Sequence, residues 1–292
     1  MQLAFIVGTG RCGSTLLHEI FAKHADSSFI SAIEENHGRL GRLHRYANAM
    51  YRAEHSPVLG RLAEEFIPTE GYALIDRLVS PIYSRPMRDL TAADATPWLE
   101  KRFRGFFEKR HADAGLPMLL HKYTGWSRLG FFAEIFPEAR FVHVVRDGRA
   151  VANSWLQMTW WNGYQGPDNW LWGPLTEEEE DRWAQQDRSY PALAALCWER
   201  LALSYRSAEA ERLSDRVYEL KYEDFLERPG ELAREMIEFM GLDWTDDFEQ
   251  QFGTFEIRSS RKAAYKRDLH SEQLAQIEAC IAPTLERFGY SG

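Results

Sequence analysis

A glycine-containing loop near the start of the chain has the spacing of a phosphate-binding loop. Gly8 and Gly13 are separated by four residues, as in the P-loop pattern, but Ser14 and Thr15 stand where that pattern has Lys and then Ser or Thr. Backbone amides at a helix N-terminus still bind an anion, and the two hydroxyls and Arg11 add side-chain donors. The lysine that bridges β- and γ-phosphates is missing. The loop is therefore predicted to hold a nucleotide with a single 5′-phosphate group rather than ATP.

A second predicted anion site lies far along the chain, at an arginine that ends an apolar run. Arg146 follows residues 141–145, and a charge at the end of a buried strand is costly unless it meets a partner. Ser154 lies about two turns into the helix predicted after it. Together Arg146 and Ser154 can hold a second phosphate. The alternative is that Arg146 pairs only with a core acid such as Asp147 or Glu223.

Short apolar runs alternate with helical patterns around these residues and predict a parallel α/β fold. The run at 3–7 ends at Gly8, and apolar residues at helical spacing follow it. Further strands are predicted at 117–123, 141–145 and 216–222, each followed by a helical pattern. Parallel sheets bind ligands beyond the carboxyl ends of their strands. The loops that follow these four strands are therefore expected to converge on one side of the sheet.

Two stretches, about 36–115 and 155–210, are predicted to be helical insertions in a single domain that spans residues 1–292. Thr176 and Glu179 in the second stretch are spaced as a capping box at the start of a helix. The second stretch also contains seven of the ten tryptophans of the chain: Trp155, Trp160, Trp161, Trp170, Trp172, Trp183 and Trp198. These rings favour an aromatic-lined ligand pocket or lid at 155–198, and the alternative is that they belong to the core.

The composition limits the classes of partner and compartment. The chain has 35 Lys and Arg against 44 Asp and Glu, a formal charge of −9, so no nucleic-acid partner is expected, because nucleic-acid tracks are basic. Its three cysteines are widely separated, which is typical of a reducing compartment, and Cys12 is interpreted as a small residue in a tight turn. The sequence shows neither a signal-sequence pattern nor an apolar run of about 18 residues. We expect a cytoplasmic protein without a membrane span, and the sequence gives no indication of its oligomeric state.

Segments at both ends and in the centre of the chain resemble the motifs of one enzyme family, and the last of them are "RSSRKAAYKRDL" and "ERFGY". The segments "GTGRCGSTLL" and "VVRDGRAVANS" resemble the 5′-phosphosulfate loop and the 3′-phosphate motif of sulfotransferases that use 3′-phosphoadenosine 5′-phosphosulfate (PAPS). The segments "LLHKYTGW" and "LKYEDFLERPGELAREMIEFMGLDW" are similar to the family's lysine-bearing strand and to its tyrosine–glutamate strand and helix. The similarity is to bacterial-type members and to the tyrosylprotein and carbohydrate branches. It implies a P-loop-like three-layer α/β fold with a central parallel β-sheet flanked by helices.

The resemblance also implies roles for individual residues. PAPS is the implied co-substrate and 3′,5′-ADP the product, without a metal, and Lys122 and Arg11 are the implied catalytic cations. Lys122 would donate to the bridging oxygen, and its alternative is a surface lysine that ends a strand. The implied contacts to the 5′-phosphosulfate are Gly10, Arg11, Cys12, Gly13, Ser14 and Thr15, and those to the 3′-phosphate are Arg146 and Ser154. Tyr222, Ser259 and Arg261 are implied as further cofactor contacts, although residues 258–268 can also be read as a solvated basic loop.

The acceptor must lose a proton, so a general base is needed close to it. Some members of the family use a glutamate shortly after the first helix, and Glu35 best matches that position, with Glu34 and His37 as alternates. Solvated loop acids are the alternative interpretation. The implied reaction is sulfuryl transfer to the hydroxyl of a small-molecule, carbohydrate or lipid-like acceptor. The competing functions are a P-loop nucleotide kinase or NTPase and a non-catalytic nucleotide-binding module.

Overall fold

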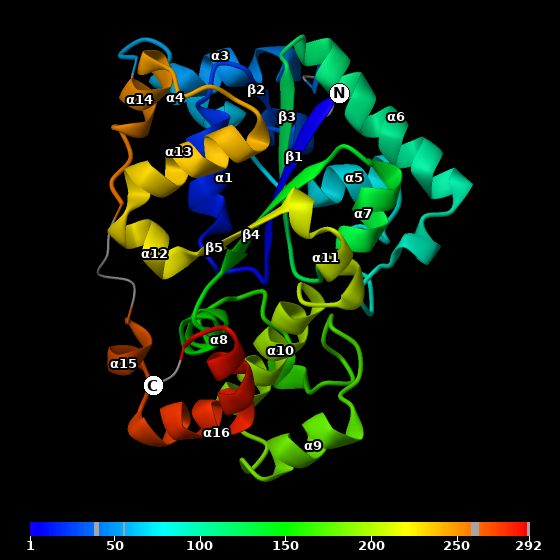
Figure 1. The fold of residues 1–292 in the computed structure, drawn as a ribbon, viewed down its shortest axis with the longest axis vertical. Helices are drawn as coiled ribbons and strands as arrows, with labels where there is room; N and C mark the ends of the chain where they lie inside the picture. The colour runs from blue at the N-terminus through cyan, green and yellow to red at the C-terminus, as the bar shows by residue number, and fades with distance from the viewer. Residues whose placement is uncertain (38–40, 55, 258–262, 291–292) are drawn as a thin grey trace.

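The framework of the structure is a parallel β-sheet of five strands in the order β2-β3-β1-β4-β5 (Figure 1). The computed structural model describes residues 1–37, 41–54, 56–257 and 263–290. The strands are β1 (Gln2–Gly8), β2 (Ser27–Ser28), β3 (Met118–Thr124), β4 (Arg140–Val145) and β5 (Val217–Lys221). The four longer strands confirm the prediction from the sequence. The two residues of β2 were not predicted, because so short a strand has no recognisable pattern.

Side chains of the strands alternate between the two faces of the sheet, so that each face is covered by its own helices. Phe5 belongs to a core cluster that includes Phe107 of α6 (Pro97–Ala114) and Phe132 of α7 (Leu129–Ile135). Its neighbour Ile6 belongs to another cluster, with residues of α1 (Ser14–Ala22) and α13 (Pro229–Met240). Figure 1 shows these two groups of helices on opposite sides of the sheet. The predicted three-layer α/β fold is confirmed.

Both predicted insertions are helical in the described residues. Thr176 Oγ1 accepts a hydrogen bond from Glu179 N at 3.2 Å and Thr176 N donates to the Glu179 carboxylate at 2.7 Å, which confirms the predicted capping box. The first stretch begins at the last residue of α2 (Ala32–Asn36) and contains α3 (Ala47–Arg52), α4 (Gly60–Ala63), α5 (Tyr72–Leu78) and α6. The second contains α9 (Glu177–Ala184), α10 (Tyr190–Ser204) and α11 (Ala208–Arg212).

A further group of helices packs together beyond the carboxyl ends of the strands (Figure 1). It consists of α8 (Gly148–Leu156), α10 and α16 (Ser271–Arg287). An added Cβ on Gly148 would lie 2.5 Å from the ring of Trp198, so glycine lets the start of α8 pack directly on α10. Arg149 Nη1 donates to Glu278 Oε1 at 2.8 Å and thereby ties α8 to α16. The helix that carries Ser154 is therefore fixed by the last helix of the chain.

The order of the strands also determines where a ligand can bind. β1 pairs with β3 on one side and with β4 on the other. The strands that follow β1 in the sequence are therefore added first on one side of it and then on the other, which makes β1 the point where the strand order reverses. Open parallel sheets bind ligands at such a switch point, beyond the carboxyl ends of the strands. The loops after β1, β3 and β4 meet there.

Candidate functional site

A cavity of about 600 Å³ lies beside the loop that follows β1. One wall is formed by the loop itself and the start of α1, with Arg11 and Thr15. Another wall is formed by α5 and the residues before it, including Glu70 and Tyr72. The end of β3 and tryptophans from α8 and the second insertion complete the cavity. The predicted convergence of the strand-end loops is confirmed: those after β1 and β3 line this cavity, Arg146 after β4 contacts Arg11, and Tyr222 after β5 packs against Gly13.

The loop has a backbone that favours glycine. Gly10 and Gly13 have φ of 86° and 99°, and Arg11 between them has φ of 54°, in the left-handed region that non-glycine residues rarely adopt. A Cβ added to Gly13 would lie 2.2 Å from Cδ2 of Tyr222, the first residue of α12 (Tyr222–Glu227). The Arg146 guanidinium lies 5.1 Å from the centroid of the same ring. Tyr222 thus packs between the loop and Arg146 and supports both.

Substitution of Gly13 by alanine is expected to destabilise the protein by about 2–4 kcal/mol, from left-handed backbone strain and overpacking together. Urea denaturation measures this change in the free energy of unfolding. Gly105→Ala in α6 is the matched control, because a Cβ there meets no atom within 4 Å and its backbone is helical. The control is expected to be neutral or stabilising by up to about 1 kcal/mol. Equal stability of the two variants would contradict the packing of Tyr222 against Gly13.

Arg11 joins the two predicted phosphate sites. Arg11 Nε donates to Ser154 Oγ at 2.9 Å, and Arg146 Nη1 donates to the backbone oxygen of Arg11 at 2.9 Å. The acids named as alternative partners of Arg146 bind other groups: Asp147 Oδ2 pairs with Arg149 at 2.8 Å, and Glu223 Oε1 accepts from Asp147 N at 3.1 Å. Three residues that are up to 143 positions apart in the sequence are therefore adjacent in the fold.

Lys122 is buried at the end of β3, so it is not a surface lysine. Its Nζ donates to Thr15 Oγ1 at 2.7 Å and pairs with Glu70 Oε1 at 2.6 Å. β1 and β3 pair in parallel with Ile6 opposite Lys122, which brings the ammonium group beside the start of α1. The structure therefore places one cation between the glycine loop and a carboxylate of the cavity wall.

The three acid–base residues predicted after the first helix lie in different surroundings. Glu34 is buried and forms an ion pair with Arg110 of α6, and the exposed His37 has its Nε2 3.3 Å from Glu65 Oε2. Glu35 Oε1 accepts a hydrogen bond at 3.2 Å from the backbone nitrogen of Ala73, a residue that lines the cavity. Glu35 thus lies at the margin of the cavity, whereas Glu34 faces away from it.

Glu70 is a candidate that sequence reasoning missed. It lines the cavity and holds Lys122, yet it stands in the first insertion without any motif around it. Two histidines near Lys122 are poor candidates for a base. Burial and then the Lys122 ammonium lower the pKa of His121 to about 3, and the same causes lower the pKa of His18 well below its usual value. Both are neutral at pH 7, and His121 Nε2 lies 2.7 Å from Tyr83 Oη.

The tryptophans of the second insertion divide into two groups. Trp155, Trp160 and Trp172 line the cavity. Trp155 Nε1 is buried and has no hydrogen-bond partner among the described residues. The other four are buried in the core around α8, α10 and α16: Trp161, Trp170, Trp183 and Trp198. Trp155 and Trp172 belong to the same core cluster as well as lining the cavity, and Trp126, outside the insertion, also lines it.

Three further expectations concern two cofactor contacts near the C-terminus, metal binding and membrane spans. The predicted cofactor contacts Ser259 and Arg261 lie outside the residues that the structure describes. Across the described ranges, no group of three or more His, Cys, Asp or Glu side chains is arranged to hold a metal ion. No helix in that part of the chain is both long and apolar enough to cross a membrane.

Comparison with known proteins adds independent findings. A model of the "Sulfotransferase family" matches residues 4–246. The chain is 24% identical over 314 residues to omega-hydroxy-beta-dihydromenaquinone-9 sulfotransferase Stf3 of Mycobacterium bovis and of Mycobacterium tuberculosis, a match that covers 98% of this chain and 74% of that protein. Its fold is similar to that of sulfotransferase STF9 from Mycobacterium avium, with a TM-score of 0.54 and 16% identity over 99% of this chain and 77% of that one. The sulfotransferase domain of the Synechococcus PCC 7002 olefin synthase gives a TM-score of 0.50 and 17% identity, over 94% and 93% of the two chains.

Proposed function

The chain belongs to the family of PAPS-dependent sulfotransferases, and from that premise we propose that it transfers the sulfuryl group of PAPS to a hydroxyl of a largely apolar acceptor. The observation that carries the proposal is the pair of hydrogen bonds by which Arg11 joins Ser154 and Arg146. These bonds bring the residues proposed for the 5′-phosphosulfate next to those proposed for the 3′-phosphate.

The residues present fit such a co-substrate. Its two anionic ends require two clusters of donors, and Arg11, Ser14 and Thr15 form one while Arg146 and Ser154 form the other. Gly13 lets the ring of Tyr222 pack directly against the N-terminus of α1, because a side chain there would collide with it, and backbone amides at a helix N-terminus bind anions. When bound, PAPS supplies an activated sulfuryl group on a phosphate leaving group.

Lys122 is proposed to neutralise charge at the leaving phosphate. Its ammonium group is already fixed by Thr15, at the first turn of α1, and by Glu70. A preorganised cation in a buried position stabilises developing negative charge more than a solvated one does. Lys122 thus needs little reorganisation to donate to the bridging oxygen.

We propose that a glutamate accepts the proton of the acceptor hydroxyl. Glu35 is the candidate from the sequence, and Glu70 is the candidate that the cavity adds. The geometry favours Glu70, because its carboxylate lines the cavity, whereas Glu35 hydrogen-bonds to Ala73 at the margin. A base in this wall would lie within reach of a hydroxyl that enters beside Lys122.

The acceptor is proposed to pack against aromatic side chains. Trp155, Trp160 and Trp172 give the cavity an apolar, aromatic wall, and the buried Trp155 Nε1 offers a hydrogen-bond donor. The Stf3 relatives are named for an omega-hydroxylated menaquinone, which is a hydroxylated lipid-like acceptor. A small hydroxylated molecule with a substantial apolar part fits this wall best.

Selective binding of 3′,5′-ADP tests the proposal. At about one hundred times its dissociation constant, 3′,5′-ADP is expected to stabilise the protein by about 2.7 kcal/mol, measured as a thermal shift. Arg146→Ala is expected to weaken its binding by about 10- to 150-fold, because a charge-assisted hydrogen bond contributes about 1.5–3 kcal/mol. AMP lacks the 3′-phosphate, so its binding should change much less.

Arg212→Ala is the matched control, because Arg212 is an exposed arginine at the end of α11. Stabilisation by ATP-Mg alone would favour the kinase or NTPase alternative. An equal loss of AMP and 3′,5′-ADP binding in Arg146→Ala would show that Arg146 does not hold the 3′-phosphate. Ligand binding without any turnover would favour the non-catalytic module.

A further inference from the structure

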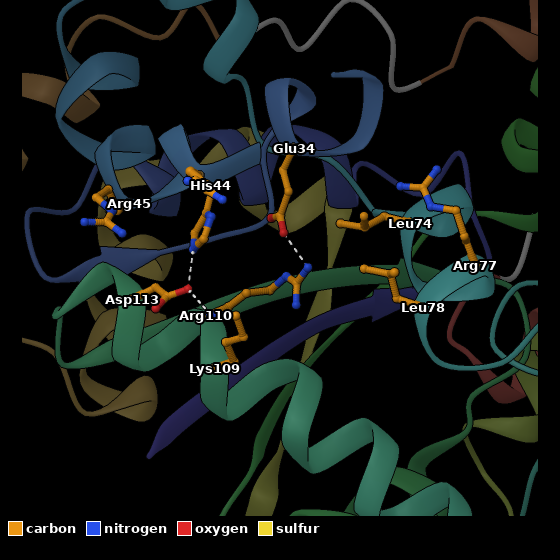
Figure 2. A pocket seen from close by; sticks show the side chains of 10 residues that line it. Glu34, His44, Arg45, Leu74, Arg77, Leu78, Lys109, Arg110 and Asp113 are labelled. Atoms are coloured by element: carbon orange, nitrogen blue, oxygen red, sulfur yellow. Dashed lines mark hydrogen bonds and ion pairs between the residues drawn. The ribbon is translucent and has the colours of Figure 1, made fainter. Parts of the chain in front are cut away.

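A second cavity, of about 770 Å³, shares the helix α5 with the candidate site (Figure 2). Its other walls are α2, α6 and the short helix at Gly41–Tyr46. Figure 2 shows Leu74 and Leu78 of α5 facing the buried pair of Glu34 and Arg110, with Arg45 and Arg77 on opposite sides of that pair. The cavity combines a small apolar surface with charges on both sides.

Cations outnumber carboxylates around this cavity. Asp113 Oδ2 lies 2.8 Å from Lys109 Nζ and 3.4 Å from His44 Nε2, so its charge is already compensated. Glu34 is compensated by Arg110. In the described part of the chain, no ion pair compensates the remaining three arginines that line the cavity: Arg42, Arg45 and Arg77. In a chain with a formal charge of −9, this local excess of positive charge, on exposed side chains around a cavity, favours an anionic ligand over a neutral or cationic one.

Arg110 indicates where such a partner would bind. The residue is only 9% exposed, and its guanidinium lies 3.4 Å from the centroid of the Phe106 ring. Its Nη1 donates to the Phe106 carbonyl oxygen at 3.0 Å and its Nη2 to Glu34. Its Nε is buried without a hydrogen-bond partner among the described residues, and so is Glu34 Oε2. A buried donor without an acceptor is costly, so a molecule inside the cavity is expected to satisfy it.

We propose that this second cavity binds a small organic phosphate or sulfate ester. The oxyanion would pair with the arginines around the cavity, where guanidinium groups bind such anions in a bidentate manner. The apolar part of the ester would pack against Leu74 and Leu78. A hydroxylated or neutral ligand would leave the arginines without a counter-charge.

The shared helix requires a test that separates the two cavities. Tyr72, Ala73 and Asp76 of α5 line the candidate site, whereas Leu74, Arg77 and Leu78 line the second cavity. An ester could therefore bind in either. Variants of arginines that line only the second cavity distinguish the two.

Isothermal titration calorimetry of the full chain with phenyl phosphate tests the proposal, with phenyl sulfate as a second arm. The wild-type protein is expected to bind at least one of the two esters, and the better ligand identifies the oxyanion. The double variant Arg45→Glu/Arg77→Glu is expected to bind the better ester at least about tenfold more weakly than the wild type does, since each substitution removes a charge-assisted contact. The double variant Arg212→Glu/Arg287→Glu makes the same change of charge on exposed residues of α11 and α16 and should bind like the wild type.

Three results would overturn the proposal. They are the absence of binding to both esters by the wild type, an equal loss in the two double variants, and a loss in Arg146→Ala that the Arg45→Glu/Arg77→Glu variant does not show. The last result would place the ester in the nucleotide site instead. No arm uses PAPS or turnover, so a failure of the proposed sulfotransferase reaction leaves this test intact.

Discussion

Replacement of Lys122 by methionine is expected to lower kcat by about 10²- to 10³-fold, because loss of one preorganised donor to a developing anion has about that effect. Methionine preserves most of the volume of the lysine chain, so the buried position stays filled. Lys122→Arg keeps the charge but changes its geometry, so its kcat is expected to lie between those of the wild type and Lys122→Met. Steady-state kinetics with PAPS and an acceptor measure kcat and KM separately.

The control for this variant is Lys101→Met, on the exposed surface of α6. It should leave kcat unchanged. The affinity for 3′,5′-ADP, measured by calorimetry, is expected to fall together with kcat in Lys122→Met, since the 5′-phosphate of the product carries the charge that Lys122 is proposed to neutralise. Full activity of Lys122→Met, or a loss confined to KM, would show that Lys122 does not act at the leaving group.

Glu70→Gln is expected to lower kcat by about 10²- to 10⁴-fold, because general base catalysis contributes about that much. Glutamine has the same shape as glutamate but does not accept a proton. The pH profile of kcat separates a base from a residue that only positions Lys122. Loss of the base removes the acidic limb of the profile, whereas misplacement of Lys122 lowers the whole curve and leaves its shape intact.

Glu35→Gln is the matched variant, because the sequence proposes Glu35 as the base. A loss of the acidic limb in Glu35→Gln, with near-normal kinetics in Glu70→Gln, would assign the role to Glu35. If both variants keep full activity, neither Glu70 nor Glu35 is the base. Binding of 3′,5′-ADP is expected to remain intact in both variants, which provides the control for folding.

The positions of the residues proposed to bind phosphate could be predicted from the sequence because their signals are local. Buried parallel strands are continuous apolar runs, and Arg11, Lys122 and Arg146 each stand at or just after the end of one. Sheet topology then brings strand ends together. The family resemblance and the alternation of apolar runs with helical patterns therefore predicted the same parallel α/β fold.

The acceptor half could not be predicted in the same way. Helices α2, α4 and α5 have five, four and seven residues, too few for a helical period to show which face is buried. Glu34 and Glu35 are adjacent, and the environment of Glu34 is set by Arg110, 76 residues away. Glu70 becomes visible as a candidate only through its contact with Lys122.

The tie between α8 and α16 has a consequence for biosynthesis. Arg149 on α8 donates a hydrogen bond to Glu278, and Tyr290 Oη donates one to Glu223. Both hydrogen bonds can therefore be in place only after the ribosome has made residue 290. At a translation rate of about 5–20 residues per second, both proposed phosphate motifs are made on the order of 10 s before these contacts can form. Competence of the proposed nucleotide site is therefore acquired only once residue 290 has been made, and a ribosome stalled before residue 278 would carry a chain that has both proposed motifs but not the packing that orients them.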